Sequence, residues 1–161
     1  MGLLGLKRDK RFHQGYYKPR NPEKYTGKGP IIYRSGLELK FMKFCDDSTN
    51  VIAWASEPVP IPYFDTVQGK WRNYYIDNFV EIKEGNIIKK YLIEIKDKKE
   101  TKKPEMKKGK RKTTILYEQA TFQTNCCKWR FAKKFCDDHG MEFLLLGYSL
   151  KDGFEAISLN L

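Results

Sequence analysis

The sequence is poor in the residues that build metal and disulfide frameworks. It contains only two histidines and four cysteines, and no two cysteines form a C-x-x-C pair. A zinc site of Cys126 or Cys127 with Cys136 and His139 is an alternative, but it fits no standard spacing. We therefore interpret the cysteines as small buried hydrophobic residues in a reducing compartment, and we find little support for histidine-based catalysis.

Long apolar runs are also missing. No stretch is long enough to span a bilayer, and residues 1–6 have neither the length nor the order of regions of a secretory signal. The hydrophobic content of 40% is nevertheless sufficient for one domain with its own core. These observations predict a soluble intracellular protein that has no membrane partner.

Positive charge is abundant, and it is concentrated in two blocks. The net charge is +11, and residues 1–34 and 96–112 contribute +7 each, so the rest of the chain is slightly acidic. Clustered lysine and arginine bind the phosphate backbone of nucleic acids without sequence preference. Such blocks can also be solvated tails, but we favour nucleic acid as the partner.

The charge blocks suggest how the chain is organised. We divide it into a basic N-terminal arm at 1–30 and a domain at 31–161 with a lysine-rich loop at 97–112. The arm has many Gly, Pro and basic residues and no sustained periodicity, so we expect it to be extended and to become ordered on a partner. Its aromatic residues are expected either to stack on bases or to pack on the domain: Tyr16, Tyr17 and Tyr25.

Hydrophobic periodicity in the domain predicts an α/β fold with a mixed sheet between helices. The first helix begins after Ser35, and Glu38 completes a capping-box pattern there. Alternating prolines at 58–62 indicate an edge or an extended connection. The remaining expected elements are strands at 51–55, 74–80, 91–96, 141–148 and 154–159 and a helix at 114–138.

Two strand-like runs carry carboxylates that are expected to face each other. Glu94 and Lys96 are two residues apart, so their side chains project from the same face of a strand. Gly85 and Asn86 are typical of a two-residue hairpin loop, and counting back from this loop sets Asp77 opposite Glu94. Apolar residues occur on both faces, which indicates a hairpin covered on both sides. Facing carboxylates repel unless a proton or cation lies between them, and this favours a divalent metal site over an ordinary solvated pair.

The motifs and their order resemble the PD-(D/E)xK nuclease superfamily, in the branch of transposon-end endonucleases and phage head completion nucleases. The resemblance covers about residues 30–148 and implies a restriction-endonuclease-like mixed central sheet flanked by helices. Ile76 occupies the position where the family usually has a proline before the catalytic aspartate. The segments that carry the resemblance are YRSGLELKF (33–41), SEPVPIPY (56–63), YYIDNF (74–79) and YLIEIK (91–96).

The resemblance also implies roles for individual residues. Asp77 and Glu94 would bind Mg²⁺, with Mn²⁺ as an alternative, together with the backbone carbonyl of Ile95. Lys96 would orient or help deprotonate the attacking water and stabilise charge on the phosphate. Glu38 would bind a second metal or a metal-bound water, although it is also placed to cap its helix. The residues expected to contact DNA are Lys98, Lys99, Lys102, Lys103, Lys107, Lys108, Gln119, Gln123 and Lys128.

The resemblance implies a magnesium-dependent deoxyribonuclease, with endonuclease or exonuclease activity or both, that acts on packaged phage DNA during head completion and head-tail joining. Its expected partners are DNA and other virion head or neck proteins, in the virion and the host cytoplasm. The alternative is a basic DNA-binding virion assembly protein with a catalytically inactive nuclease-like core. All four catalytic positions carry suitable side chains, which favours the enzyme. A third option, an RNA-binding module, is disfavoured because the sequence shows no recognisable aromatic RNA-binding signature.

Overall fold

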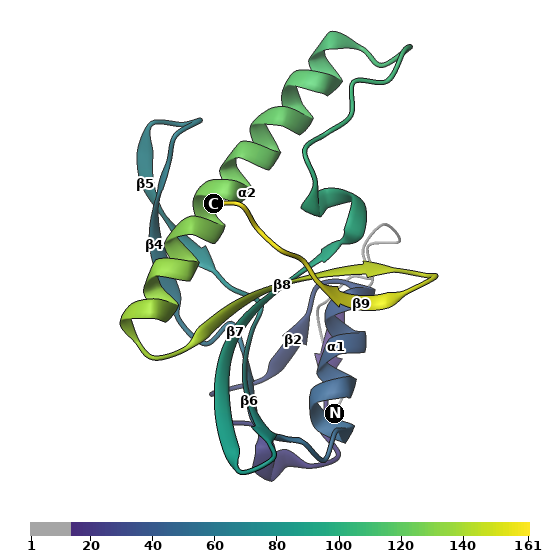
Figure 1. Cartoon of the computed structure of the whole chain (residues 1–161). Helices are drawn as coiled ribbons and strands as arrows, with labels where there is room; N and C mark the ends of the chain where they lie inside the picture. The colour runs from purple at the N-terminus through teal and green to yellow at the C-terminus, as the bar shows by residue number, and fades with distance from the viewer. Residues whose placement is uncertain (1–13) are drawn as a thin grey trace.

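The computed structural model describes residues 14–161, and residues 1–13 of the predicted arm lie outside the described part. A central sheet and two helices dominate this range (Figure 1). In chain order the elements are β1 (Gly15–Tyr17), η1 (Pro22–Lys24), β2 (Ile31–Tyr33), α1 (Gly36–Asp47), β3 (Val51–Ser56), β4 (Pro60–Asp65), β5 (Lys70–Tyr75), β6 (Asn78–Glu84), β7 (Ile87–Asp97), η2 (Lys98–Thr101), α2 (Lys112–Asp138), β8 (Glu142–Ser149) and β9 (Gly153–Ala156).

The central sheet has five strands in the order β3-β6-β7-β8-β9. Strands β7 and β8 are parallel, and α2 lies between them in the chain; the other neighbouring strands are antiparallel. The pairs β1–β2 and β4–β5 form separate two-stranded sheets. The proline-bearing segment is thus β4, a strand of a hairpin outside the central sheet. This agrees with the prediction, since proline lacks the backbone donor that a central strand needs.

The two helices cover opposite faces of the central sheet, so the predicted mixed sheet between helices is confirmed. On one face, Phe41 and Cys45 of α1 pack in a cluster with Ile93. On the other face, Cys127 of α2 packs in a cluster with Leu92. Neighbouring residues of β7 therefore point to opposite sides and are buried on both. The described cysteines carry free thiols, and the three buried ones are core residues: Cys45, Cys127 and Cys136.

A tight turn sets the register between β6 and β7. Gly85 has φ 61°, a left-handed conformation that glycine adopts without steric cost and that suits the first position of a two-residue hairpin loop. The ladder pairs Glu84 with Ile87 next to the turn and continues to Asn78 and Ile93 at the far end. The predicted turn and the predicted register are therefore confirmed.

The single strand expected at 74–80 is instead two strands. Strand β5 ends at Tyr75, and β6 begins after a connection formed by Ile76 and Asp77. Strand β5 pairs with β4, whereas β6 pairs with β3 and β7. Because the chain changes partner here, Tyr74 is buried in the cluster that includes α2, while the Tyr75 side chain is 59% exposed.

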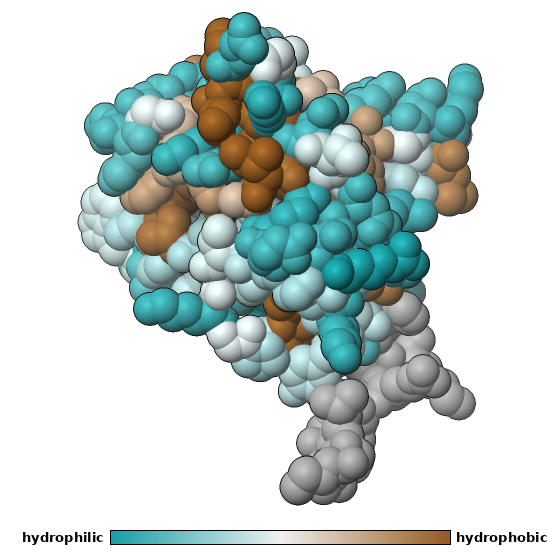
Figure 2. Space-filling view, turned by 90° about the horizontal axis from the view of Figure 1, so that it is seen from below, coloured by the Kyte–Doolittle hydropathy of each residue, from teal (hydrophilic) through white to brown (hydrophobic). Residues whose placement is uncertain are grey.

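The surface at the β6–β7 turn combines hydrophilic residues with separate hydrophobic patches (Figure 2). Ile87 and Ile88, which follow the turn directly, are exposed. No helix in residues 14–161 is long and apolar enough to cross a membrane. The turn lies at the opposite end of the hairpin from Asp77 and Glu94, so these exposed isoleucines are remote from the predicted site.

Residues 14–30 pack on the domain, which differs from the expected extended arm. The ring of Tyr25 meets Trp54 edge to face, with 4.7 Å between the ring centroids. The Lys24 ammonium donates to the carbonyl oxygens of Cys45, Asp46 and Ser48 at 2.7–2.8 Å. These carbonyls lie at the C-terminal end of α1, where a cation is favoured by the helix dipole.

The buried carboxylate of Asp46 is the main polar anchor of this segment. Its Oδ2 accepts hydrogen bonds from the Tyr17 hydroxyl and the Arg20 backbone N–H, both at 2.6 Å. Its Oδ1 accepts one from the Asn21 backbone N–H at 2.9 Å. Burial raises the pKa of Asp46, but these hydrogen bonds outweigh burial and hold the pKa below its usual value. Tyr17 and Tyr25 therefore pack on the domain, the second of the two roles expected for them.

We predict that Asp46→Asn lowers the free energy of unfolding by about 1–3 kcal/mol, because an amide cannot accept from donors on both sides. The pKa of Asp46 is depressed by folding, so its contribution is present at neutral pH and is lost as the pH falls through the folded-state pKa. Urea unfolding as a function of pH measures both effects. Asp47→Asn is the control, since its carboxylate is exposed and only weakly paired with Arg20 at 3.9 Å; equal losses in the two variants would contradict the anchor.

Candidate active site

Asp77 and Glu94 come together at the end of the β6–β7 ladder. Asp77 directly precedes Asn78, which begins β6 and pairs with Ile93. Continuing this register by one residue sets Asp77 opposite Glu94, as predicted. The Asp77 Oδ2 accepts a hydrogen bond from the Ile95 backbone N–H at 2.8 Å. This bond ties the connection between β5 and β6 to β7 and fixes the carboxylate beside Glu94.

Glu94 and Lys96 lie on the face of β7 that α2 covers. The Lys96 Nζ is 3.1 Å from Glu94 Oε1, and Glu94 is only 4% exposed. The second carboxylate oxygen, Oε2, is buried and has no hydrogen-bond partner. Burial lowers the pKa of Lys96, but the neighbouring Glu94 and Asp77 outweigh burial and raise it. The lysine is therefore held as an ammonium beside two carboxylates.

The charge of Glu94 opposes the ionisation of Asp77. The pKa of Asp77 is raised well above its usual value, first by burial and then by the charge of Glu94. The Ile95 hydrogen bond and the Lys96 ammonium lower it, but they do not compensate fully. The pair consequently needs a proton or an additional cation.

Glu38 has both of the roles that its sequence position allows. Its backbone N–H donates to Ser35 Oγ at 3.1 Å, so Ser35 caps α1 as predicted. The Glu38 Oε2 accepts from the Arg34 backbone N–H at 2.8 Å. The pKa of Glu38 is raised, mainly by burial and in part by the charges of Glu57 and Glu94, while Arg34 lowers it. The carboxylate thus belongs to the helix start and lies within the electrostatic field of the site.

Sequence reasoning missed Tyr74 as a neighbour of Glu94. The Tyr74 hydroxyl is buried without a hydrogen-bond partner, and burial, followed by the charge of Glu94, raises its pKa. The Lys128 Nζ lies over two aromatic rings, 5.5 Å from the centroid of Tyr74 and 5.9 Å from that of Tyr63. Nothing in the sequence marks Tyr74, because its orientation depends on the pairing of β5 with β4.

The residues predicted to contact DNA occupy different environments. Lys128 is half-buried, and its pKa is lowered first by burial and then by the charge of Lys96, so it lies near Lys96. Gln123 donates to Thr66 Oγ1 at 3.4 Å, and Gln119 is half-buried on α2. Of the loop lysines, Lys98 pairs with Asp152 and Glu155, and Lys107 lies 3.9 Å from Glu105. Exposed lysines with no ion pair to a described residue are Lys99, Lys102, Lys103 and Lys108.

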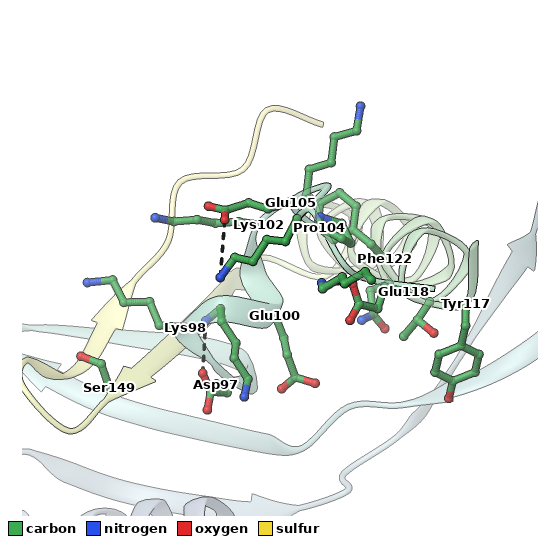
Figure 3. Close-up of a pocket in the computed structure, with 16 residues that line it drawn as sticks. Asp97, Lys98, Glu100, Lys102, Pro104, Glu105, Tyr117, Glu118, Phe122 and Ser149 are labelled. Atoms are coloured by element: carbon green, nitrogen blue, oxygen red, sulfur yellow. Dashed lines mark hydrogen bonds and ion pairs between the residues drawn. The ribbon is translucent and has the colours of Figure 1, made fainter. Parts of the chain in front are cut away.

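A pocket of about 710 Å³ lies between the lysine-rich loop and α2. Figure 3 shows it extending from Ser149 at the end of β8 to Tyr117 on α2. Its lining begins at Asp97, the residue directly after Lys96. The pocket therefore begins one residue after Lys96 in the sequence, and several lysines of the loop line it.

Comparison with known proteins identifies the class to which this site belongs. A family model described as TnsA-like endonuclease N terminal matches residues 48–147, a range that includes Asp77, Glu94 and Lys96 but not Glu38. The chain belongs to this family, and it is a nuclease with a restriction-endonuclease-like fold. Nuclease domains of this kind generally use divalent metal ions.

A particular relative narrows the comparison. The chain is 34% identical over 152 residues to "Head completion nuclease" of Enterobacteria phage T4, an alignment that covers 92% of this chain and 97% of the relative. No solved structure matches the chain at a significant level. The predicted family and its nuclease activity are therefore confirmed.

We predict that Asp77→Asn stabilises the metal-free protein by up to about 1 kcal/mol, because it removes the repulsion with Glu94. The raised pKa of Asp77 means that its ionisation opposes folding as the pH rises, so the gain should increase from acidic to neutral pH. Chemical unfolding in EDTA measures it. Asp65→Ala is the contrast and should destabilise, since it removes the Oδ1 that accepts from Val67, Gln68 and Thr124. Destabilisation by both changes would argue against repulsion at Asp77.

Proposed function

We propose that the chain is a magnesium-dependent deoxyribonuclease with Asp77, Glu94 and Lys96 at its catalytic centre and Glu38 beside them. The observation that carries the proposal is the pairing of half-buried Asp77 with buried Glu94. One oxygen of Glu94 has no hydrogen-bond partner, and the Lys96 ammonium lies 3.1 Å from the other. A buried polar atom without a partner is costly, and a divalent cation is the group that would satisfy both carboxylates.

The donor set fits Mg²⁺, with Mn²⁺ as an alternative. Residues 14–161 contain no group of three or more His, Cys, Asp and Glu side chains arranged to hold a metal. Magnesium commonly uses one or two carboxylates and keeps several waters, so Asp77, Glu94 and the carbonyl of Ile95 suffice. When bound, the ion would polarise the phosphate and lower the pKa of a coordinated water. Glu38 would hold a second ion or a water at the edge of the site.

The protein's own groups orient the reaction. The ion pair with Glu94 keeps Lys96 as an ammonium, which donates hydrogen bonds and has no free pair to accept a proton. We therefore assign Lys96 to orienting the attacking water and stabilising charge on the phosphate, rather than to removing a proton. The Tyr74 hydroxyl lies close to the Glu94 carboxylate and would help to fix its orientation. Lys128, held over the Tyr74 ring, would contact a neighbouring phosphate.

The basic surface supports DNA as the substrate. We assign the contact with the DNA backbone to Gln119, to Gln123 and to the lysines of the loop, because clustered lysines attract phosphate without sequence preference. The relative from phage T4 is named a head completion nuclease. By analogy with that name, the chain acts on packaged phage DNA during head completion, with endonuclease or exonuclease activity or both. Virion head or neck proteins would be its partners, in the virion and the host cytoplasm.

We predict that the protein converts closed circular plasmid to nicked and linear forms only when Mg²⁺ or Mn²⁺ is present. Lys96→Ala should lower the rate by about 10²- to 10³-fold, since one donor to developing charge is lost. Lys90→Ala is the matched control, because Lys90 also lies on β7 but pairs with Glu81 away from the site. Gel electrophoresis of the plasmid measures the rates, and a closed circle reports endonuclease action alone.

The alternative function predicts a different result from the same experiment. A basic virion assembly protein with an inactive core would retard the plasmid on the gel and leave it intact with either metal. Cleavage that persists unchanged in Lys96→Ala and Asp77→Asn would instead mean that the assigned site is wrong.

We further predict that Tyr74→Phe weakens Mg²⁺ or Mn²⁺ binding by about 10-fold, because loss of a partner that orients a metal ligand commonly has this effect. Isothermal titration calorimetry measures the affinity without DNA. Tyr63→Phe is the control. It removes a hydroxyl from the ring that packs edge to face on Tyr74, with 6.4 Å between the centroids, and it should change the metal affinity little. Equal weakening in both variants would assign the effect to packing rather than to the hydroxyl beside Glu94.

A further inference from the structure

We propose that the pocket between the lysine-rich loop and α2 binds a single-stranded segment of DNA next to the scissile phosphate. The inference rests on the proposed nuclease function and names a class of substrate: DNA with an unpaired stretch beside the cleavage point. Three features of the pocket carry it, namely its position beside the carboxylate pair, its uncompensated positive charge and its size together with its aromatic lining.

The pocket begins where the catalytic strand ends. Asp97, which lines it, follows Lys96 directly, and its Oδ1 accepts from the Lys99 backbone N–H at 3.2 Å to cap η2. Glu100 also lines the pocket and is close enough to raise the pKa of Lys96.

The positive charge of the pocket is only partly compensated. Six lysines and four acidic residues line it. Lys98, Lys107 and Lys110 each lie within ion-pair distance of an acidic group. Within residues 14–161, no acidic group forms an ion pair with Lys99, Lys102 or Lys103, so three ammonium groups are free for phosphates. Asp97 and Glu100 weaken the field at the inner end, which places the strongest attraction farther along the loop.

Size and lining favour a single strand over a duplex. The volume of about 710 Å³ lies in the range of small-ligand pockets, about 300–1,000 Å³, which suits a few unpaired nucleotides rather than a whole double helix. Tyr117 lines the pocket and is 73% exposed, and Phe122 lines it one turn farther along α2. Phe122 is half-buried and packs on Trp129, so Tyr117 is the ring available for stacking. Unpartnered lysines combined with an exposed aromatic ring are a usual means of binding unpaired bases.

The test measures binding of a fluorescein-labelled oligothymidylate and of a blunt hairpin duplex with the same number of phosphates. Fluorescence anisotropy in EDTA prevents cleavage and uses the full chain. Tyr117→Ala should weaken oligothymidylate binding by about 5- to 100-fold, since stacking on an aromatic side chain contributes about 1–3 kcal/mol per base. Its effect on the duplex should be much smaller. Lys102→Ala should reduce the salt dependence of oligothymidylate binding.

Two matched controls separate the pocket from general surface charge and exposure. Leu116→Ala changes an exposed neighbour of Tyr117 on α2, and Lys43→Ala changes an exposed lysine on α1; neither residue lines the pocket. The proposal is overturned if either control matches its partner variant, or if single strand and duplex lose affinity equally. Because binding is measured without metal, the result can be interpreted even if the protein shows no nuclease activity. Plasmid cleavage without single-strand binding in the pocket would refute this inference but not the proposed function.

Discussion

The repulsion between Asp77 and Glu94 is the constraint on which the rest of the structure depends. Half-buried Asp77 and buried Glu94 face each other across one strand pair and oppose folding, because burial strengthens like-charge repulsion and removes hydration. The Ile95 N–H and the Lys96 ammonium compensate in part. The arrangement persists because the surrounding packing fixes both strands, so the site holds excess negative charge that a divalent cation would neutralise.

Stability gained elsewhere offsets this cost. The clusters under α1 and α2 bury both faces of the central sheet, and Asp46 anchors residues 14–30 on the C-terminal end of α1. The same two helices bring the outer members of the site. Helix α1 supplies Glu38 at its first turn, and α2 supplies Lys128 near its middle. Packing and catalysis therefore share elements, which is consistent with a trade-off between stability and function at such sites.

The family assignment also changes how the basic segments are understood. The described part of the N-terminal arm is held by buried tyrosine and lysine contacts, so part of its charge serves the fold. The lysine-rich loop differs, since several of its ammonium groups are exposed and no described acidic group forms an ion pair with them. Charge counted along the sequence weighs both segments equally. The environment of each lysine shows that the loop is the stronger candidate for contact with phosphate.

The sequence by itself determined the elements whose cause is local. The Gly85-Asn86 turn set the register that places Asp77 opposite Glu94, alternation along β7 put Glu94 and Lys96 on one face, and Ser35 fixed the start of α1. Only the tertiary structure decided the break at Ile76 and Asp77, because β5 and β6 have the same period and differ only in their partners. It also decided which residues that are distant in the sequence lie near Glu94. These are Tyr74 of β5 and Lys128 of α2, whose positions depend on how separate elements pack.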